Sequence, residues 1–198
     1  MKPSWVLLLL GFAAGAAAQQ SVADIESLLP AETFKMARSP LLSGRFVQTK
    51  SLEGLAQPLR SSGQFTYARD HGVLWQVQQP FAADYVLADG RLSVAGDGTP
   101  PAFGGEVARL LTALFTLDLE MLARSFELSV QRGKSDWSLR LTPRHRALSA
   151  ALREVRLEGR SHLQRVSLLD EDGNTTRIEL QRLRVLRTLP AEVLKKFQ

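Results

Sequence analysis

Apolar and polar residues alternate with a period of two along most of the chain beyond residue 44. Residues 63–69 put Phe65, Tyr67 and Arg69 on one face, and the strand expected at residues 73–78 stops before Pro80. The pattern predicts about ten strands. They lie at residues 46–50, 63–69, 73–78, 85–88, 92–94, 126–130, 137–141, 155–157, 166–168 and 176–180, with Leu183 and Val185 in a last strand.

Short turns join nearly all of these expected strands. Residues 70–72 end in a glycine, Asp89-Gly90 is the strongest hairpin signal, and residues 170–173 form another tight turn. Neighbouring strands with short turns pair antiparallel. We therefore predict a mainly β fold with some α, an incomplete, half-open antiparallel β-barrel whose apolar side needs helices to cover it.

Two segments carry a helical period instead. Residues 21–38 form an expected N-terminal helix with a break at Pro30, and residues 106–117 carry a stripe of Val107, Leu110, Leu111, Leu114 and Phe115. Asp118 is expected to cap a second short helix that contains Leu122. These helices are either packed into a core, which the pattern itself favours, or a lid over an apolar cavity. The Gly- and Pro-rich residues 96–105 between sheet and helix predict a loop.

The first eighteen residues resemble a secretory signal peptide. Lys2 precedes an apolar run of about 14 residues, which is shorter than the ~20 of a spanning helix, and Ala16 to Ala18 offers a cleavage site. An uncleaved anchor is the alternative. We predict removal of residues 1–18 and one domain at residues 19–198. The cysteine-free sequence excludes disulfides, thiolate chemistry and N-terminal acylation, and fits the Gram-negative periplasm.

The formal charge of +5 comes from scattered arginines rather than from a basic run. This distribution argues against nucleic acid as a partner. It favours an ordinary solvated basic face, with anionic lipid surfaces as the alternative. The outward positions of the second half carry Arg140, Arg156, Arg165, Arg177, Arg182 and Arg184.

No set of residues with catalytic spacing stands out. The three histidines, His71, His145 and His162, lack ligand spacing and are expected at the surface, and no Gly-x-Ser-x-Gly elbow is present. The acidic residues 170–172 precede a turn rather than a calcium loop. We predict no enzyme, no cofactor and no metal site, although a set dispersed in sequence stays possible because triads assemble in space.

Several short motifs, in order along the chain, resemble the periplasmic outer-membrane lipoprotein carriers, the LolA-like family. They are Phe-Val-Gln-Thr-Lys at residues 46–50, residues 62–67, Arg69, Gly-Val-Leu-Trp at 72–75, Gln79-Pro80, Asp89-Gly90, residues 137–143 and residues 172–175. The resemblance covers nearly the whole mature chain. It implies an incomplete barrel with a helical lid and a hydrophobic cavity for acyl chains, received from an inner-membrane transporter and delivered to an outer-membrane acceptor. Differences at residues 70 and 92–105 indicate a divergent branch, for which another lipid such as an aryl-polyene is the alternative cargo.

Within this resemblance, Arg69 stands six residues before Trp75, where the family places an arginine that hydrogen-bonds the lid helices in the closed form. Asp70 follows it in place of the family's proline. We expect a monomeric carrier whose cavity is lined by Phe46, Phe65, Tyr67, Trp75, Val77, Leu110, Leu111, Leu114, Phe115, Leu122, Trp137 and Leu139. Ordinary core is the alternative role for each. An envelope module that binds a protein partner and a lipid hydrolase are the competing functions.

Overall fold

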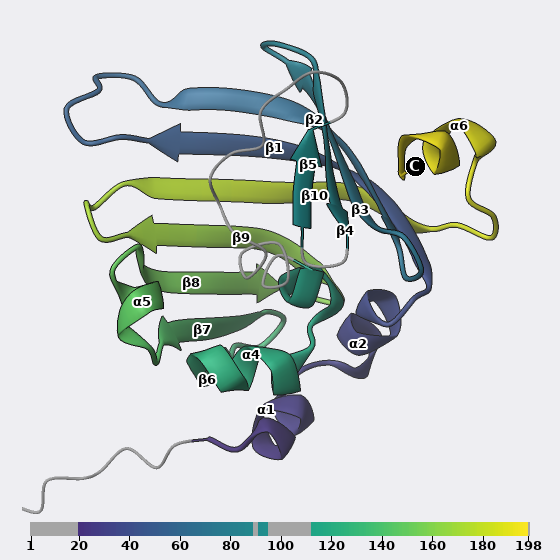
Figure 1. Ribbon diagram of the computed structural model, residues 1–198. Helices are drawn as coiled ribbons and strands as arrows, with labels where there is room; N and C mark the ends of the chain where they lie inside the picture. The colour runs from purple at the N-terminus through teal and green to yellow at the C-terminus, as the bar shows by residue number, and fades with distance from the viewer. Residues whose placement is uncertain (1–19, 89–90, 95–111, 198) are drawn as a thin grey trace, which may run out of the picture.

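Ten strands pair into one antiparallel sheet in the computed structural model of the chain (Figure 1). The structure describes residues 20–88, 91–94 and 112–197. The predicted signal peptide, Asp89-Gly90, the loop at 96–105, Leu110 and Leu111 lie outside this part. The strands are β1 (Leu41–Ser51), β2 (Leu59–Ala68), β3 (Gly72–Gln79), β4 (Ala83–Ala88), β5 (Arg91–Val94), β6 (Phe126–Arg132), β7 (Trp137–Pro143), β8 (Leu152–Gly159), β9 (Leu163–Asp170) and β10 (Thr175–Val185).

The sheet is open because its first and last strands have no strand partner among the described residues. Its order is β5-β4-β3-β2-β1-β10-β9-β8-β7-β6. Each half of the chain is a meander of neighbouring strands, and the long β1–β10 ladder joins the two halves. The predicted fold class, a half-open antiparallel barrel with helices, is confirmed.

Three helices in the first two thirds of the chain each begin after a residue that favours a helix N-terminus, either a capping side chain or a proline. Ser21 and Asp24 form a reciprocal capping box on α1 (Val22–Leu28), and Pro30 precedes α2 (Ala31–Ala37), as predicted. Asp118 Oδ1 accepts from the Met121 amide at 2.9 Å and caps α4 (Leu119–Ser125). Residues 112–116 are also helical. Figure 1 shows α1 and α4 beside β6, with α2 between α1 and the start of β1.

Strand register sorts the side chains onto two faces, which we call the inner face and the outer face. The inner face carries the apolar side chains that pack under the helices. The outer face carries the alternate residues of each strand, which point to the other side of the sheet. Cross-strand pairs such as Phe65–Trp75 and Leu139–Leu157 align the inner positions of neighbouring strands. A single apolar cluster therefore runs from β4 to β6 and includes Ile25, Phe34, Leu117 and Leu122 from the helical segments.

Several element boundaries differ from the prediction. Leu183 and Val185 do not form a separate strand, because β10 continues through a bulge at Arg182, whose φ is 52°. Strand β1 begins at Leu41, ahead of the predicted start, and β2 begins at Leu59. The short helices α5 (Arg146–Ser149), α6 (Ala191–Leu194) and the 3-10 helix η1 (Lys195–Phe197) were not predicted. A single turn is too short for an apolar helical period to show in the sequence.

The C-terminal segment covers part of the outer face. Leu74 and Val86 point away from the inner face and are nevertheless buried. Helix η1 packs against β3 and β4, where Lys196 pairs with Asp84 at 2.5 Å and the Phe197 ring stacks on His71 at 5.5 Å. This segment gives the outer face a small apolar contact at one end and leaves it polar elsewhere.

Candidate functional site

Four aromatic rings meet on the inner face where the sheet approaches the helical residues 112–116. Phe46 on β1 stacks on Trp75 of β3 with centroids 3.8 Å apart, and Phe65 on β2 lies 5.9 Å from Trp75. Phe115 lies 5.2 Å from Phe65 and 5.8 Å from Trp75. The helical segment therefore contacts the sheet through an aromatic surface in addition to its buried residues Ala113 and Leu114.

A glycine makes this close stacking possible. Gly63 stands opposite Phe46 in the β1–β2 ladder. A Cβ at residue 63 would lie 1.9 Å from the Gln76 carbonyl oxygen and 3.0 Å from Phe46 Cε1. Because any larger residue would collide with the neighbouring backbone, the glycine lets the Phe46 ring lie across β2 and reach Trp75.

The predicted cavity residues divide into two groups. Most are fully buried in the apolar cluster, whereas Trp75, Val77 and Phe115 are only partly buried. Trp137 and Leu139 on β7 belong to the packed core, and Trp137 Nε1 donates to the Arg160 carbonyl at 2.8 Å. Their role in ligand binding stays a prediction. The buried residues of the predicted set are Phe46, Phe65, Tyr67, Leu114, Leu122, Trp137 and Leu139.

The sheet adds three inner-face residues that the sequence prediction missed. Tyr85 pairs with Trp75, Val94 pairs with Tyr85, and Leu92 pairs with Leu87. Tyr85, Val94 and Leu92 are all partly buried. The Asp-Gly hairpin signal fixes Ala88 opposite Arg91, so counting back from that turn places Tyr85 opposite Val94. Their position beside Trp75 depends on the separate register between β3 and β4.

Arg69, the predicted latch, connects the sheet to the N-terminal helices. Its Nη2 donates to the Arg38 carbonyl at 2.5 Å, at the end of α2. Arg38 itself pairs with Glu26 of α1 at 2.9 Å and lies over the Phe34 ring. Among the described residues, the Arg69 side chain thus bonds to α2 rather than to residues 112–125. The latch role that the family resemblance implies for Arg69 stays a prediction.

Two hollows flank Tyr67 and Arg69 and separate them from the helical turn at residues 116–118. One, of about 340 Å³, includes Arg38, Leu117 and Glu120, and the other, of about 310 Å³, reaches His71 and Leu87. Leu117 has a φ of 48°, a left-handed conformation that is costly for a leucine. The helical turn therefore borders open space beside Arg69, while Leu117 and Leu119 anchor it in the apolar core.

The described residues offer no developed catalytic or metal centre. Ser161 Oγ lies 3.1 Å from His162 Nδ1, but the two are neighbours in the surface turn between β8 and β9, and no carboxylate orients the imidazole. His71 and His145 are exposed as predicted, and His162 is partly exposed. Within residues 20–88, 91–94 and 112–197 no three His, Asp or Glu residues gather as metal ligands, and no helix is long and apolar enough to span a membrane.

Comparison with known families identifies the class of protein. Residues 16–181 match the family described as outer membrane lipoprotein carrier protein LolA-like, so the chain belongs to this family. The predicted resemblance is confirmed, and the family is one of carriers. A search of curated protein sequences found no match.

Solved structures of similar architecture differ widely in sequence. A chain from the MucA/MucB complex of Pseudomonas aeruginosa shares 17% identity over 84% of this chain and 58% of its own, with a TM-score of 0.47. A LolA superfamily protein from Nitrosomonas europaea shares 10% identity over 85% and 96%, also with a TM-score of 0.47. A putative outer membrane lipoprotein-sorting protein domain from Vibrio parahaemolyticus shares 8% over 81% and 95%, with a TM-score of 0.34. The present chain thus spans little more than half of the Pseudomonas chain.

Proposed function

We propose that the protein is a periplasmic carrier that binds acyl chains of a lipoprotein, or of another lipidic cargo, against the inner face of its sheet. The observation that carries this proposal is the partly buried apolar surface of Trp75, Val77, Tyr85, Val94 and Phe115, between strands β3–β5 and the helical residues 112–116. Membership in the LolA-like family supports it.

The binding energy comes from removing acyl chain from water. Each buried CH₂ contributes about 0.8 kcal/mol, so a chain of a dozen carbons binds without any polar contact once a hydrophobic surface admits it. The aromatic rings around Trp75 supply wide, rigid apolar contact. In this role the protein performs no covalent chemistry, as expected of a member of a carrier family.

Release requires the helical residues 112–116 to separate from the sheet. Phe115 of this segment contacts Phe65 and Trp75, and hollows line the adjoining turn beside Arg69, although Leu117 in that turn is itself buried. Arg69 holds α2 to the end of β2 and so fixes one side of this opening. In this proposal the cargo competes with Phe115 for the same aromatic surface.

The carrier works between membranes. Residues 1–18 direct export and are removed, and the mature chain takes its cargo from an inner-membrane transporter and gives it to an outer-membrane acceptor. Membership in the family and the sequence of residues 1–18 support these steps of the proposal.

Acyl binding is tested on mature protein purified gently from its own envelope fraction. Native mass spectrometry with lipid extraction should show a stoichiometric acylated adduct, and a fluorescent fatty-acyl probe should bind in its place. Val77→Asp should abolish probe binding, because it puts a charge on the apolar surface. Val47→Asp makes the same change at a partly buried valine of the outer face and should bind normally. Bare protein that also ignores acyl probes would contradict the carrier role.

A protein-binding envelope module is the second candidate, favoured by the two open edges of the described sheet. Strand β6 has seven residues and lies at one of these edges. At this edge the Val130 N–H donates a hydrogen bond to the Gln20 side chain. An extended peptide adds a strand at such an edge through main-chain hydrogen bonds. The Arg132 N–H, two residues from that of Val130, faces the same edge, because successive amides of a strand point to opposite sides. Arg132→Pro on β6 would therefore block such pairing and leave acyl binding intact, which separates this function from the first.

A further inference from the structure

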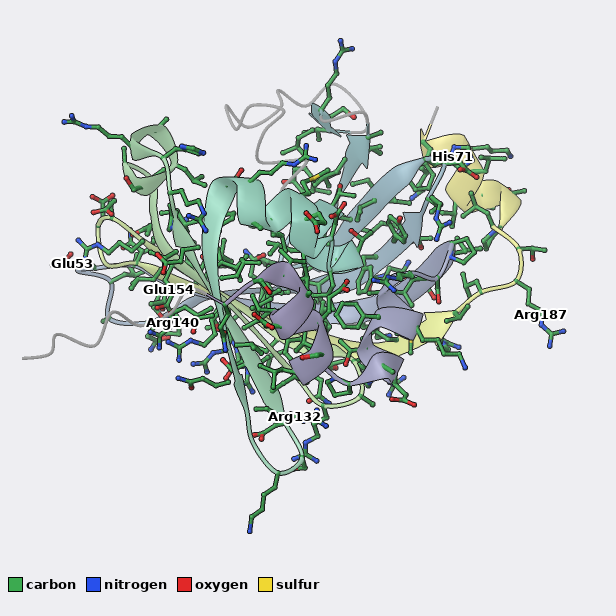
Figure 2. The ribbon with its side chains drawn as sticks, turned by 90° about the horizontal axis from the view of Figure 1, so that it is seen from below. Glu53, His71, Arg132, Arg140, Glu154 and Arg187 are labelled. Atoms are coloured by element: carbon green, nitrogen blue, oxygen red, sulfur yellow. The ribbon has the colours of Figure 1, made fainter. Side chains whose placement is uncertain are left out.

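The outer face carries a polar hollow that the acyl-binding role does not use. It measures about 590 Å³ and extends from β2 across β1, β10 and β9 to β8. Register places Arg60, Thr49, Arg177, Ser167 and Arg156 in one row across these five strands. Arg140 and Glu154, labelled close together in Figure 2, flank the row on the β7 and β8 side.

The acidic residues of the hollow are concentrated at the β8 end and are already paired. Glu154 binds Arg156 at 2.7 Å and Arg140 at 3.3 Å, and Glu158 binds Arg165 at 3.3 Å. The carboxylates at this end therefore offset the arginines beside them. The lining as a whole holds four arginines, Arg60, Arg156, Arg165 and Arg177, against three glutamates, Glu154, Glu158 and Glu179, which leaves a formal charge of +1.

The other end of the hollow holds cations without counter-charges. Arg60 and Arg177 have no carboxylate within salt-bridge distance among the described residues, and both stand directly opposite Thr49, one on each side. Strands lie about 4.8 Å apart, so the two arginine Cα atoms are about 10 Å apart and their long side chains can meet above the Thr49 hydroxyl. Glu179, two residues along β10 from Arg177, is the acid of the lining that this strand carries.

A third arginine beside Arg60 and Arg177 also lines this hollow. Arg165 lies opposite Glu179 and lines the hollow, and its Nε atom is buried without a hydrogen-bond partner in the described part of the chain. Buried donors in proteins normally have an acceptor, because desolvating one without an acceptor is costly. A ligand in the hollow does not reach this buried Nε atom, so Arg165, which pairs with Glu158, contributes only its charge to the lining.

We propose that this hollow is a binding site for a phosphate-bearing polar ligand, held by Arg60 and Arg177 over Thr49 with Ser167 at its side. Guanidinium groups bind phosphate oxygens through paired, charge-assisted hydrogen bonds, and hydroxyls complete a tetrahedral anion from other directions. The hollow is far larger than a phosphate group, so it accommodates the glycerol or sugar to which the phosphate is attached. Its concave shape suits a single headgroup rather than a flat membrane surface.

The site is independent of the proposed acyl site. Thr49 and Phe46 lie on opposite faces of β1, as the alternation of the strand requires, so the sheet separates the two ligands. One molecule cannot place its acyl chain on the inner face and its phosphate in this hollow without passing around an edge of the sheet. The failure of one proposal therefore leaves the other standing.

Titration calorimetry of the mature protein with glycerol 1-phosphate tests the site. Wild type should bind it saturably, with inorganic phosphate as competitor and sodium chloride of equal ionic strength without effect. Arg60→Gln with Arg177→Gln should weaken binding about tenfold or more, since two charge-assisted interactions are lost. Arg182→Gln with Arg184→Gln removes the same charge from β10 residues that do not line the hollow and should stay within about twofold.

Vesicles distinguish the source of the phosphate. Phosphatidic acid in phosphatidylcholine vesicles should capture wild type and not the Arg60/Arg177 double variant if the ligand is a lipid headgroup, and should capture neither if the ligand is a soluble phosphate ester. Thermal unfolding of both double variants verifies their folding. Equal loss of binding in the two double variants, or no saturable binding by wild type, would overturn the proposal, because general charge rather than this site would then explain any association.

Discussion

The two faces of the sheet are made from the same ten strands and have opposite chemistry. Leu139 is fully buried on the inner face, and its neighbour Arg140 is exposed on the outer face and pairs with Glu154. Antiparallel strands alternate side chains strictly, so each strand serves an apolar interior and a charged exterior at once. The inner face suits an acyl chain and the outer face suits a polar anion, and neither needs a second domain.

The inner face is itself divided. On strands β6 to β9 its residues are packed core, with Leu139, Leu141 and Leu157 inaccessible to solvent. On strands β3 to β5, Trp75, Tyr85 and Val94 remain partly exposed, although they stand in the same kind of register. The helices explain the difference, because α1 and α4 pack against β6. The proposed binding surface is therefore the part of the inner face that lies away from α1 and α4, next to core residues such as Phe65 and Val73 that are as buried as Leu139.

The largest expected effect is on the free energy of unfolding, and it compares two adjacent residues that lie on opposite faces of the sheet. Leu139→Ala should lower the free energy of unfolding by about 2–5 kcal/mol, since it leaves a cavity in a packed core. Arg140→Ala should change it by about 1 kcal/mol or less, because an exposed ion pair contributes little. Urea unfolding followed by circular dichroism measures both. Similar losses for the two variants would mean that the outer face contributes to stability as much as the core.

Much of this organisation could be predicted from sequence. The alternation of residues such as Phe65 and Tyr67 with polar neighbours is local, and it marks the strands and their inner face. Helix breaks and caps at Pro30 and Asp118 are also local and were predicted correctly. Hairpin turns add the pairing of consecutive strands, which explains why the open antiparallel sheet followed from the pattern.

The remaining features depend on contacts between residues far apart in the sequence. The ladder between β1 and β10 and the bulge at Arg182 are set by the meeting of two chain halves. The Arg69 partner depends on where α2 ends in space, and the hydrogen bond to Arg38 spans 31 positions. The outer hollow also needs register across five strands, so the scattered arginines could be noticed but not assembled into a row.

A smaller effect concerns the contact that joins the sheet to α2. Arg69→Leu should cost about 1 kcal/mol of stability or less, the typical value of one hydrogen bond, and should speed release of a bound acyl probe because α2 is no longer held to β2. Stopped-flow displacement of a fluorescent fatty acid measures the release rate. Arg187→Leu, at an exposed arginine that Figure 2 shows projecting from the C-terminal segment, is the control. Unchanged release in Arg69→Leu would exclude the latch role.

The smallest expected effect lies at the turn between β9 and β10, which belongs to neither face. The Asn174 side chain donates to Asp170 Oδ2 at 2.9 Å and, as the main cause, lowers the pKa of Asp170 from its ordinary value of 3.8; the Asn174 amide adds to this. A lowered pKa in the folded state stabilises the protein above pH 3.8, and this contribution is lost as pH falls through the folded-state pKa.

Asp170→Asn should therefore be less stable than wild type near pH 6, and the difference should shrink steadily below pH 3.8. Urea unfolding at a series of pH values from 6 downward measures it. Asn174→Ala should give the same convergence with falling pH, since it removes the donor rather than the carboxylate, and the double variant should add little to either single change. Parallel pH profiles for wild type and Asp170→Asn would show that the turn is held by its backbone geometry, including the positive φ of Gly173, and not by the ionised carboxylate.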